Sequence, residues 1–214
     1  ITGIVLICWS FAVFLDSGNL QEIEKYYKMG IIRGVTTNPT ILHHAGVTGS
    51  LGLKRMAQLI APLPLSVEVT SNDPQTILNQ AHTFSEWFTN INVKVPIHGP
   101  NGELENLGII HDLEVFHNIR VNVTAMMSAQ QCFLAATVGA TYVSIFGGRV
   151  NNMGYNVCTE ITKLRNVLER EGLKSQIIVG STREVLNVME WLEAGAHIVT
   201  VSPDILKGMI VHPY

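Results

Sequence analysis

Short apolar runs alternate along the chain with longer segments in which apolar residues recur at helical spacing. The short runs are rich in Val, Ile and Leu, and Gly, Pro, Asn or Asp residues follow them, as is typical of buried strands. The predicted strands lie at residues 11–15, 31–37, 65–70, 91–96, 120–124, 140–146, 175–180 and 196–201. The predicted helices lie at about 19–30, 50–60, from 74 onward, up to about 117, and at about 128–138, 155–171, 182–194 and 203–210.

These eight strand–helix units predict an α/β fold whose parallel strands close into a (βα)8 TIM barrel. A doubly wound open sheet is the alternative, but the sequence has neither GxGxxG nor GxxxxGK[ST], the loops that bind nucleotide phosphates in such folds. We expect residues 1–214 to form a single domain. Residues 1–10 are apolar but lack the basic start of a signal peptide, and we treat them as an N-terminal extension of unassigned role.

Polar residues alternate with β-branched residues along four of the predicted strands. Because successive strand residues face opposite sides, the β-branched set should pack on the helices and the polar set should line the barrel. The polar set comprises Ser66, Glu68, Thr70, Asn92, Lys94, Asn122, Thr124 and Ser144, and Phe146 shares its parity. Asp16 and Asn38 follow the first two strands. Active sites of TIM barrels lie at the carboxyl ends of the strands, so a site is predicted there, although a structural hydrogen-bond network is an alternative.

Lys94 is the only lysine that alternates with buried-type residues on a predicted strand, between Val93 and Val95. Burial disfavours the ammonium form of a lysine, and the neutral amine can attack a carbonyl to form a Schiff base. A lysine that only pairs with an acid inside the barrel is the structural alternative.

Two segments at strand ends are suited to binding an anion. Arg149 follows a Gly-Gly pair after one strand, and Gly180-Ser181-Thr182-Arg183 ends the next strand and is predicted to open a helix. Guanidinium groups, a serine hydroxyl and a helix N-terminus all bind phosphate, and phosphate sites recur at this place in TIM barrels.

Charged residues make up only 14% of the chain, and the formal net charge is −3. Without a basic field the chain is not expected to bind nucleic acid, and its first apolar stretch is too short for a membrane span. Small molecules and copies of the chain itself are the expected partners. Cys8, Cys132 and Cys158 show no CxxC spacing, which favours a reducing cytoplasm and no zinc site, and the histidines show no metal-ligand spacing.

Several of these motifs together resemble the transaldolase family, in particular its small-subunit branch, which includes fructose-6-phosphate aldolase. The matching segments, from about residue 12 to 213, are Phe14-Leu15-Asp16-Ser17, Gly34-Val35-Thr36-Thr37-Asn38-Pro39-Thr40, Val93-Lys94-Val95-Pro96, Asn122-Val123-Thr124, Tyr142-Val143-Ser144, Gly148-Arg149 and Ser181-Thr182-Arg183. The resemblance implies transfer of a dihydroxyacetone unit between sugar phosphates, as in the pentose phosphate pathway, by pentamers or decamers.

The resemblance also implies a role for each catalytic residue. Lys94 would form a Schiff base with the C2 carbonyl of a ketose, and Asp16 would assist proton transfer beside the breaking C3–C4 bond. Glu68 and Thr124 would hold and activate a catalytic water. The iminium serves as the electron sink, so no metal or organic cofactor is implied.

Substrate-binding roles follow from the same resemblance. Asn38, Asn122 and Ser144 would bind substrate hydroxyls, with Phe146 in the same site. Arg149, Ser181 and Arg183 would bind the terminal phosphate. A sulfonate, as in the sulfosugar transaldolases of the same family, would suit these three residues equally well.

The chain departs from the family pattern in several places. The aldolase branch tends to carry Gln where Glu68 stands and Tyr where Phe146 stands, so this chain favours transaldolase over fructose-6-phosphate aldolase. The loop at residues 98–102 is longer than usual and could reshape the acceptor side of the site. The usual C-terminal helix beyond position 214 is absent from the sequence, which puts the assembly in question. Outside this class, a non-catalytic sugar-phosphate binding barrel is the alternative.

Overall fold

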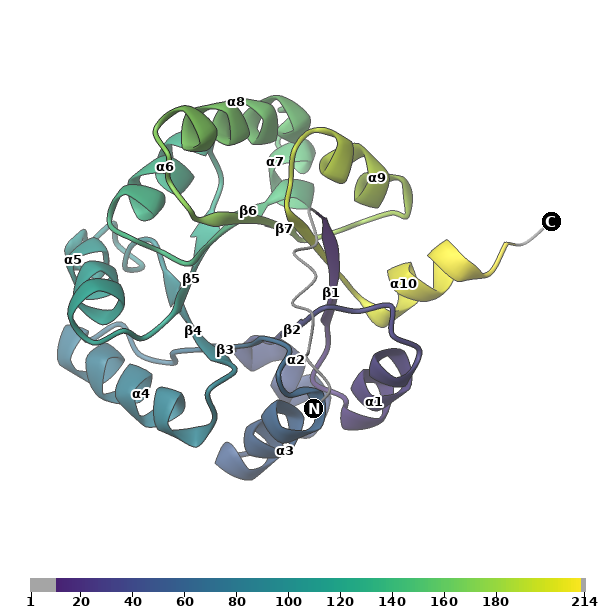
Figure 1. Cartoon of the computed structure of the whole chain (residues 1–214), viewed down its shortest axis with the longest axis horizontal. Coiled ribbons are helices and arrows are strands. Elements are labelled where there is room, and N and C mark those ends of the chain that lie inside the picture. Colours follow the sequence, from purple (N-terminus) through teal and green to yellow (C-terminus); the bar gives the residue numbers. More distant parts are fainter. Residues whose placement is uncertain (1–10, 213–214) are drawn as a thin grey trace, which may run out of the picture.

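The computed structural model describes residues 11–212, and the predicted extension at residues 1–10 lies outside this range. Within the described range, eight parallel strands close into a barrel in sequence order, ringed by helices (Figure 1). The strands are β1 (Ala12–Asp16), β2 (Val35–Thr36), β3 (Leu65–Glu68), β4 (Ile91–Pro96), β5 (Val121–Met126), β6 (Tyr142–Phe146), β7 (Gln176–Gly180) and β8 (Ile198–Val201). The predicted TIM barrel is therefore confirmed, and the open sheet is excluded.

Closure of the barrel comes from pairing of the first strand with the last. Leu15 is aligned with Val201 across β1 and β8, in the same parallel sense as every other pair. Further round, Lys94 on β4 lies between Glu68 on β3 and Asn122 on β5. The register therefore brings these three polar residues to one level of the barrel.

Most helices fall where the apolar spacing predicts them. The helices are α1 (Leu20–Lys28), α2 (Pro39–His44), α3 (Ser50–Ile60), α4 (Pro74–Trp87), α5 (Glu105–His111), which continues as a π-helical turn (Asp112–Phe116), α6 (Ala129–Thr137), α7 (Gly147–Asn152), α8 (Val157–Arg170), α9 (Leu186–Glu193) and α10 (Pro203–Ile210). The short helices α2 and α7 are not among the predicted elements. In the part of the chain that the structure describes, none of the helices combines the length and apolarity needed to cross a bilayer.

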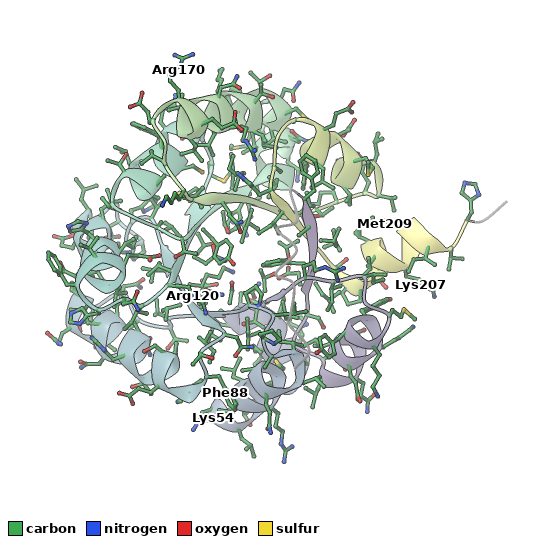
Figure 2. All side chains as sticks on the ribbon, viewed as in Figure 1. Lys54, Phe88, Arg120, Arg170, Lys207 and Met209 are labelled. Carbon is green, nitrogen blue, oxygen red and sulfur yellow. The ribbon has the colours of Figure 1, made fainter. Side chains whose placement is uncertain are left out.

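Buried apolar side chains form two separate clusters. The larger one lies between the sheet and the surrounding helices and includes Leu15, Val93 and Trp191. The smaller one consists of Phe14, Tyr142, Ile178 and Ile198, on the opposite strand parity. Side chains fill the centre of the ring, so the barrel is not an open pore (Figure 2). The smaller cluster forms an apolar floor below the polar residues at the carboxyl ends of the strands.

Several strands are shorter than predicted, and the differences at β2 and β3 affect the lining of the barrel. β2 keeps only Val35 and Thr36 of the predicted 31–37. Gly34 lies against the ring of Phe14, where an added Cβ would be 2.6 Å from the ring, so the chain passes over this side chain before it joins the sheet. β3 ends at Glu68, and Thr70 pairs with Gln80 instead of lining the barrel, which corrects the parity prediction at that position.

Candidate active site

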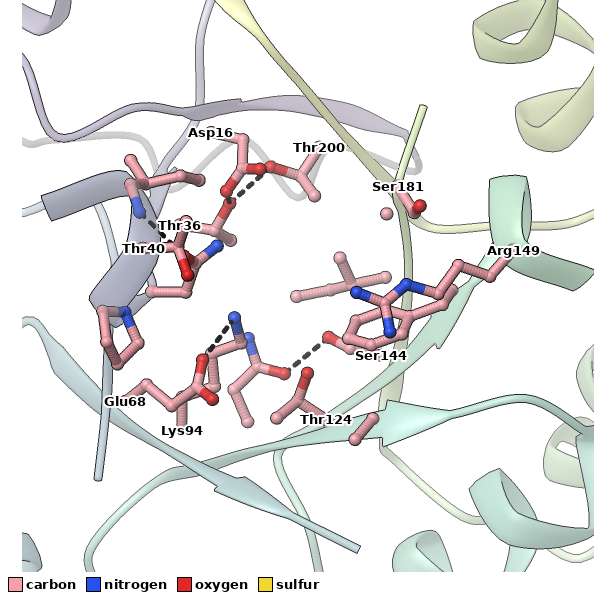
Figure 3. Close-up of a pocket in the computed structure, with 18 of the residues that line it drawn as sticks. Asp16, Thr36, Thr40, Glu68, Lys94, Thr124, Ser144, Arg149, Ser181 and Thr200 are labelled. Atoms are coloured by element: carbon pink, nitrogen blue, oxygen red, sulfur yellow. Dashed lines mark hydrogen bonds and ion pairs between the residues drawn. The ribbon is translucent and has the colours of Figure 1, made fainter. Parts of the chain in front are cut away.

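A polar cavity of about 590 Å³ opens at the carboxyl ends of the strands (Figure 3). All the residues predicted for the site line it: Asp16, Asn38, Glu68, Lys94, Asn122, Thr124, Ser144, Phe146, Arg149, Ser181 and Arg183. They come from five strands, β1, β3, β4, β5 and β6, and from the segments that follow β2, β6 and β7, which brings together residues far apart in the sequence.

Lys94 extends from β4 into this cavity and is held by two acceptors. Its Nζ lies 3.0 Å from Oε2 of Glu68 and donates a 3.1 Å hydrogen bond to the carbonyl oxygen of Thr37. The Lys94 side chain is only 10% exposed, and that of Glu68 is 20% exposed. The ammonium group thus has a carboxylate within proton-transfer distance in a mostly water-excluded site.

Asp16 ends β1 on the inner face of the barrel. Its Oδ1 accepts a 2.7 Å hydrogen bond from the Thr36 hydroxyl, and Thr36 lies 2.6 Å from the hydroxyl of Thr200. Burial raises the pKa of Asp16 above its ordinary value, while the Thr36 hydrogen bond and the charge of Lys94 lower it and Glu68 raises it further. Burial is the largest of these effects, so the site favours a proton on this carboxyl.

A directed chain of hydrogen bonds crosses β6, β5 and β3. The Ser144 hydroxyl donates to Oδ1 of Asn122 at 2.6 Å, and Nδ2 of Asn122 donates to the Ser66 hydroxyl at 3.0 Å. Asn122 uses its oxygen and its nitrogen within this chain. The Ser144 oxygen remains able to accept a hydrogen bond from a bound molecule.

Thr124 and Ala125, together with Asn122, form the part of the cavity wall supplied by β5. The Thr124 hydroxyl is buried and has no hydrogen-bond partner among the residues described. Ala125 has a left-handed backbone with a φ of 61°, and the pairing of β5 with β6 shifts register there. A bulge of this kind re-aims side chains next to a site, at a cost in backbone strain for a non-glycine residue.

Asn38 follows β2 and caps the short helix α2. Its Oδ1 accepts a 2.9 Å hydrogen bond from the Ile41 N–H, as expected for an N-cap residue followed by Pro39. With the oxygen occupied, the amide nitrogen of Asn38 is the atom that can bind a ligand, and it can only donate.

Arg149 and Arg183 supply positive charge on the side of the cavity formed by β6 and β7. The Arg149 guanidinium stacks over the Phe146 ring, 4.7 Å from its centroid, and points into the cavity (Figure 3). Neither arginine forms an ion pair with a carboxylate in residues 11–212. Gly148 allows the two segments to meet, because a Cβ at this position would lie 1.9 Å from the carbonyl oxygen of Ser181.

The segment after β7 differs from its prediction. Helix α9 begins at Leu186 and not directly after Ser181, so residues 181–185 form a loop. Asn187 accepts hydrogen bonds from the N–H groups of Arg183 and Glu184, which fixes the end of this loop. Arg183 therefore extends from a loop whose end is held by the Asn187 side chain.

The loop at residues 98–102 does not line the cavity. The Glu103 carboxylate closes it by accepting hydrogen bonds from the N–H and the amide of Asn101. The idea that this loop reshapes the acceptor side of the site therefore finds no support in the geometry.

Sequence reasoning did not nominate several lining residues: Thr36, Pro39, Thr40, Ile41, Ala125, Ile178, Gly180 and Thr200. Thr36 and Thr200 matter most because they contact Asp16 or its partner. The parity argument would have found them if it had been extended to β2 and β8.

Comparisons with known proteins agree with this geometry. A family model described as Transaldolase/Fructose-6-phosphate aldolase matches residues 13–214. The chain is 34% identical over 204 residues to a "Probable transaldolase" of Dehalococcoides mccartyi, covering 94% of this chain and 91% of that protein. It is 35% identical over 200 residues to a "Probable transaldolase" of Lactiplantibacillus plantarum, covering 94% of this chain and 89% of that protein.

Two solved structures are similar to this chain in fold alone. A lactate oxidase of Pediococcus acidilactici superposes with a TM-score of 0.62 at 14% identity, covering 92% of this chain and 64% of that one. A mandelate oxidase superposes with a TM-score of 0.60 at 9% identity, covering 90% of this chain and 65% of that one. The family assignment therefore rests on the family model and on the sequence relatives, and on that basis this chain belongs to the transaldolase/fructose-6-phosphate aldolase family.

Proposed function

We propose that this protein is a class I transaldolase that transfers a dihydroxyacetone unit from a phosphorylated ketose, such as fructose 6-phosphate or sedoheptulose 7-phosphate, to an aldose phosphate. The observation that carries the proposal is the position of Lys94, whose buried Nζ contacts the Glu68 carboxylate inside a polar cavity. An amine held in this way can lose its proton locally and become a nucleophile.

The first step forms the Schiff base. Glu68 accepts a proton from Nζ of Lys94, and the amine adds to the C2 carbonyl of the ketose to give a carbinolamine. Glu68 returns the proton that it took from Nζ to the C2 hydroxyl, which leaves as water, and an iminium remains. The Thr124 hydroxyl, which has no partner among the described residues, is suited to hold this water together with Glu68.

Cleavage and transfer then depend on Asp16. Its carboxylate takes the proton of the C4 hydroxyl as the C3–C4 bond breaks, and the bonding electrons move into the iminium to give an enamine. The aldehyde product leaves, and the enamine carbon attacks the carbonyl of the acceptor aldehyde. Asp16 returns the proton to the new hydroxyl, and water releases the product from Lys94.

The direction of the hydrogen bonds supports recognition of a polyol. Asn38 can donate only through its amide nitrogen, while the Ser144 oxygen is able to accept, because their other atoms are committed within the protein. Neighbouring hydroxyls of a sugar offer both an acceptor and a donor. Arg149, Ser181 and Arg183 would bind the terminal anion of the same substrate.

We extend the proposal to the type of reaction, the cellular compartment and the assembly of the enzyme. Glu68 and Phe146 both line the cavity, and the family resemblance ties this pair to transaldolase activity more than to aldolase activity. Cys132 and Cys158 are free thiols, in keeping with a reducing cytoplasm and a place in the pentose phosphate pathway. We also propose one domain and a homo-oligomer, and exposed apolar side chains on α9 and α10, among them Leu186, Met189 and Ile210, support the homo-oligomer.

The test is reductive trapping. The protein is incubated with fructose 6-phosphate and borohydride, and its intact mass and peptide map are measured. We expect one reduced adduct on Lys94 and none in Lys94→Met. Lys163→Met, which removes an exposed lysine of α8, is the matched control and should trap normally.

The acceptor decides between the candidate activities. Product formation only when an aldose phosphate is added supports transaldolase, whereas release of free dihydroxyacetone without an acceptor supports aldolase. A 6-sulfonated ketose in place of the phosphorylated one tests the sulfosugar alternative. Saturable binding of sugar phosphates without any adduct would overturn the proposal and favour a non-catalytic binding barrel.

A further inference from the structure

Two buried threonine hydroxyls next to Asp16 have no part in the steps above. Thr36 on β2 is 3% exposed, and Thr200 on β8 is 7% exposed. They flank β1 from opposite sides, with Asp16 aligned with Thr36 and Phe14 aligned with Thr200. Both side chains line the cavity (Figure 3).

Counting protons gives the direction of the contacts. The Thr36 oxygen is 2.7 Å from Oδ1 of Asp16 and 2.6 Å from the Thr200 oxygen. An ionised carboxylate can only accept, so Thr36 must donate its single proton to Asp16. The short contact between the two threonines then requires that Thr200 donates to Thr36. With Asp16 ionised, the chain runs from Thr200 through Thr36 to Asp16.

We propose that Thr200 and Thr36 are positioning residues that hold Asp16 as an oriented carboxylate, with Oδ1 bound by Thr36 and the other oxygen left for the substrate hydroxyl. The inference rests on the proposed role of Asp16 as the proton acceptor. Thr200 contributes through Thr36, because a hydroxyl that accepts a hydrogen bond becomes a stronger donor.

The electrostatic surroundings show why Asp16 needs such support. The charged groups that act on it are Lys94 on β4, which favours its ionised form, and Glu68 on β3, which opposes it. Burial opposes ionisation of Asp16 more strongly than the Thr36 hydrogen bond or the Lys94 charge favours it. A carboxylate that must accept a proton near neutral pH is therefore dependent on the hydroxyl that donates to it.

Thr200 is itself held from a second direction. The Thr182 hydroxyl donates a 2.7 Å hydrogen bond to the carbonyl oxygen of Thr200. Thr182 belongs to the loop that carries Ser181 and Arg183, so the strand segment at Thr200 is anchored by the anion-binding side of the site. Within residues 11–212, the Thr200 hydroxyl contacts the Thr36 hydroxyl alone.

The experiment measures kcat/KM against pH for transfer from fructose 6-phosphate to erythrose 4-phosphate. In Thr200→Val the acid limb of the pH profile should move to higher pH by about 0.5–1 unit. The reason is that this variant loses one neutral hydrogen bond, which is made to Thr36 and not to the carboxyl itself. In Thr36→Val the shift should be larger, because the lost bond is made to a charge. Thr200→Ser, which restores the hydroxyl, should return the limb to its wild-type position.

Controls separate this inference from the proposed function. Thr137→Val removes a hydroxyl that bonds within its own helix and should leave the profile unchanged. Absence of a borohydride adduct in the wild type would refute the proposed function itself. A normal adduct in Thr200→Val with an unmoved acid limb would overturn only the positioning role, and so would an equal loss of activity at every pH. If Thr200→Val fails to fold, Thr200→Ala gives the same comparison.

Discussion

Asp16 shows at the scale of one residue how function and stability oppose each other in this site. Burial raises the pKa of Asp16 from an ordinary value of 3.8, so the folded state binds its proton more tightly than the unfolded state does. The contribution of this group to stability is therefore complete below about pH 4 and is lost as pH rises through the folded-state pKa. At neutral pH the ionised form that the mechanism needs is the form that folding disfavours.

Asp16→Asn should therefore make the protein more stable as it makes it less active. The amide oxygen can still accept the Thr36 hydrogen bond, but it carries no charge to be desolvated. The difference in melting temperature, variant minus wild type, should grow as pH rises from about 4 to 7, and the transfer rate should fall about 100-fold or more. Thermal unfolding at several pH values checks this, and a difference that stays constant with pH would contradict it.

At the scale of elements, the strands could be predicted more fully than the segments that join them. Polar–apolar alternation on β4 placed Lys94 correctly because the alternation is a local property of the chain. α2 and α7 were not predicted because a Gly-rich, His-rich segment and a Gly-Gly pair resemble loops. For α2 a signal was present, since Asn38-Pro39 is an N-cap followed by proline in the first turn.

Site residues could be predicted where the polar–apolar alternation of a single strand was enough to place them. The contact between Thr36 and Thr200 joins residues 164 positions apart and exists only because β1 lies between β2 and β8 in the closed barrel. The helix predicted directly after Ser181 starts only at Leu186, because Asn187 accepts the N–H groups of Arg183 and Glu184 and holds the loop open. The threonine contact depends on closure of the barrel, which no local pattern contains, whereas the Asn187 contacts are local and join residues three and four positions apart.

The opposite end of the barrel is held together by side chains of a different kind. Oε1 of Glu114 accepts hydrogen bonds from the Val121 N–H at 2.7 Å and from the Thr141 N–H at 2.6 Å. Val121 is the first residue of β5, and Thr141 directly precedes β6. Its Oε2 accepts the Thr141 hydroxyl at 3.1 Å. Burial raises the pKa of Glu114, more than these hydrogen bonds lower it. This end of a TIM barrel serves stability, so Glu114 is expected to hold strands and not to affect chemistry.

Glu114→Ala should accordingly lower stability and spare activity. Two part-buried backbone N–H groups would lose their acceptor, which should reduce the free energy of unfolding by about 2–5 kcal/mol. Urea denaturation gives this value, and transfer assays well below the transition should show nearly wild-type rates. Glu169→Ala, which removes an exposed carboxylate paired with Arg165 on α8, is the comparison and should cost less than about 1 kcal/mol. Equal stability of the two variants would refute the role of Glu114.

At the scale of the whole molecule, most large apolar side chains are inside, but several on α9 and around the C-terminal end of α10 are exposed. The exposed fractions are 60% for Leu186, 63% for Met189, 59% for Ile210 and 57% for Val211. The two helices meet where Gly208 faces Val185, whose side chain would lie 2.9 Å from an added Cβ. Figure 1 shows α10 projecting from the barrel next to α9. Exposed apolar surface is a feature of protein–protein interfaces, and we propose that these side chains belong to one.

We propose that copies of the chain pair through this surface in the homo-oligomer, and the mass in solution tests this proposal. Light scattering after size exclusion should give a multiple of the 23.5 kDa chain mass. Met189→Glu combined with Ile210→Glu should shift the protein toward that single-chain mass, because burying two unpaired carboxylates costs more than the apolar contact returns. Arg170→Glu, a charge reversal on the exposed end of α8, should leave the mass unchanged (Figure 2). A wild-type protein that is monomeric at high concentration would refute the homo-oligomer, whereas an oligomer that survives both substitutions would place the interface on another face of the barrel.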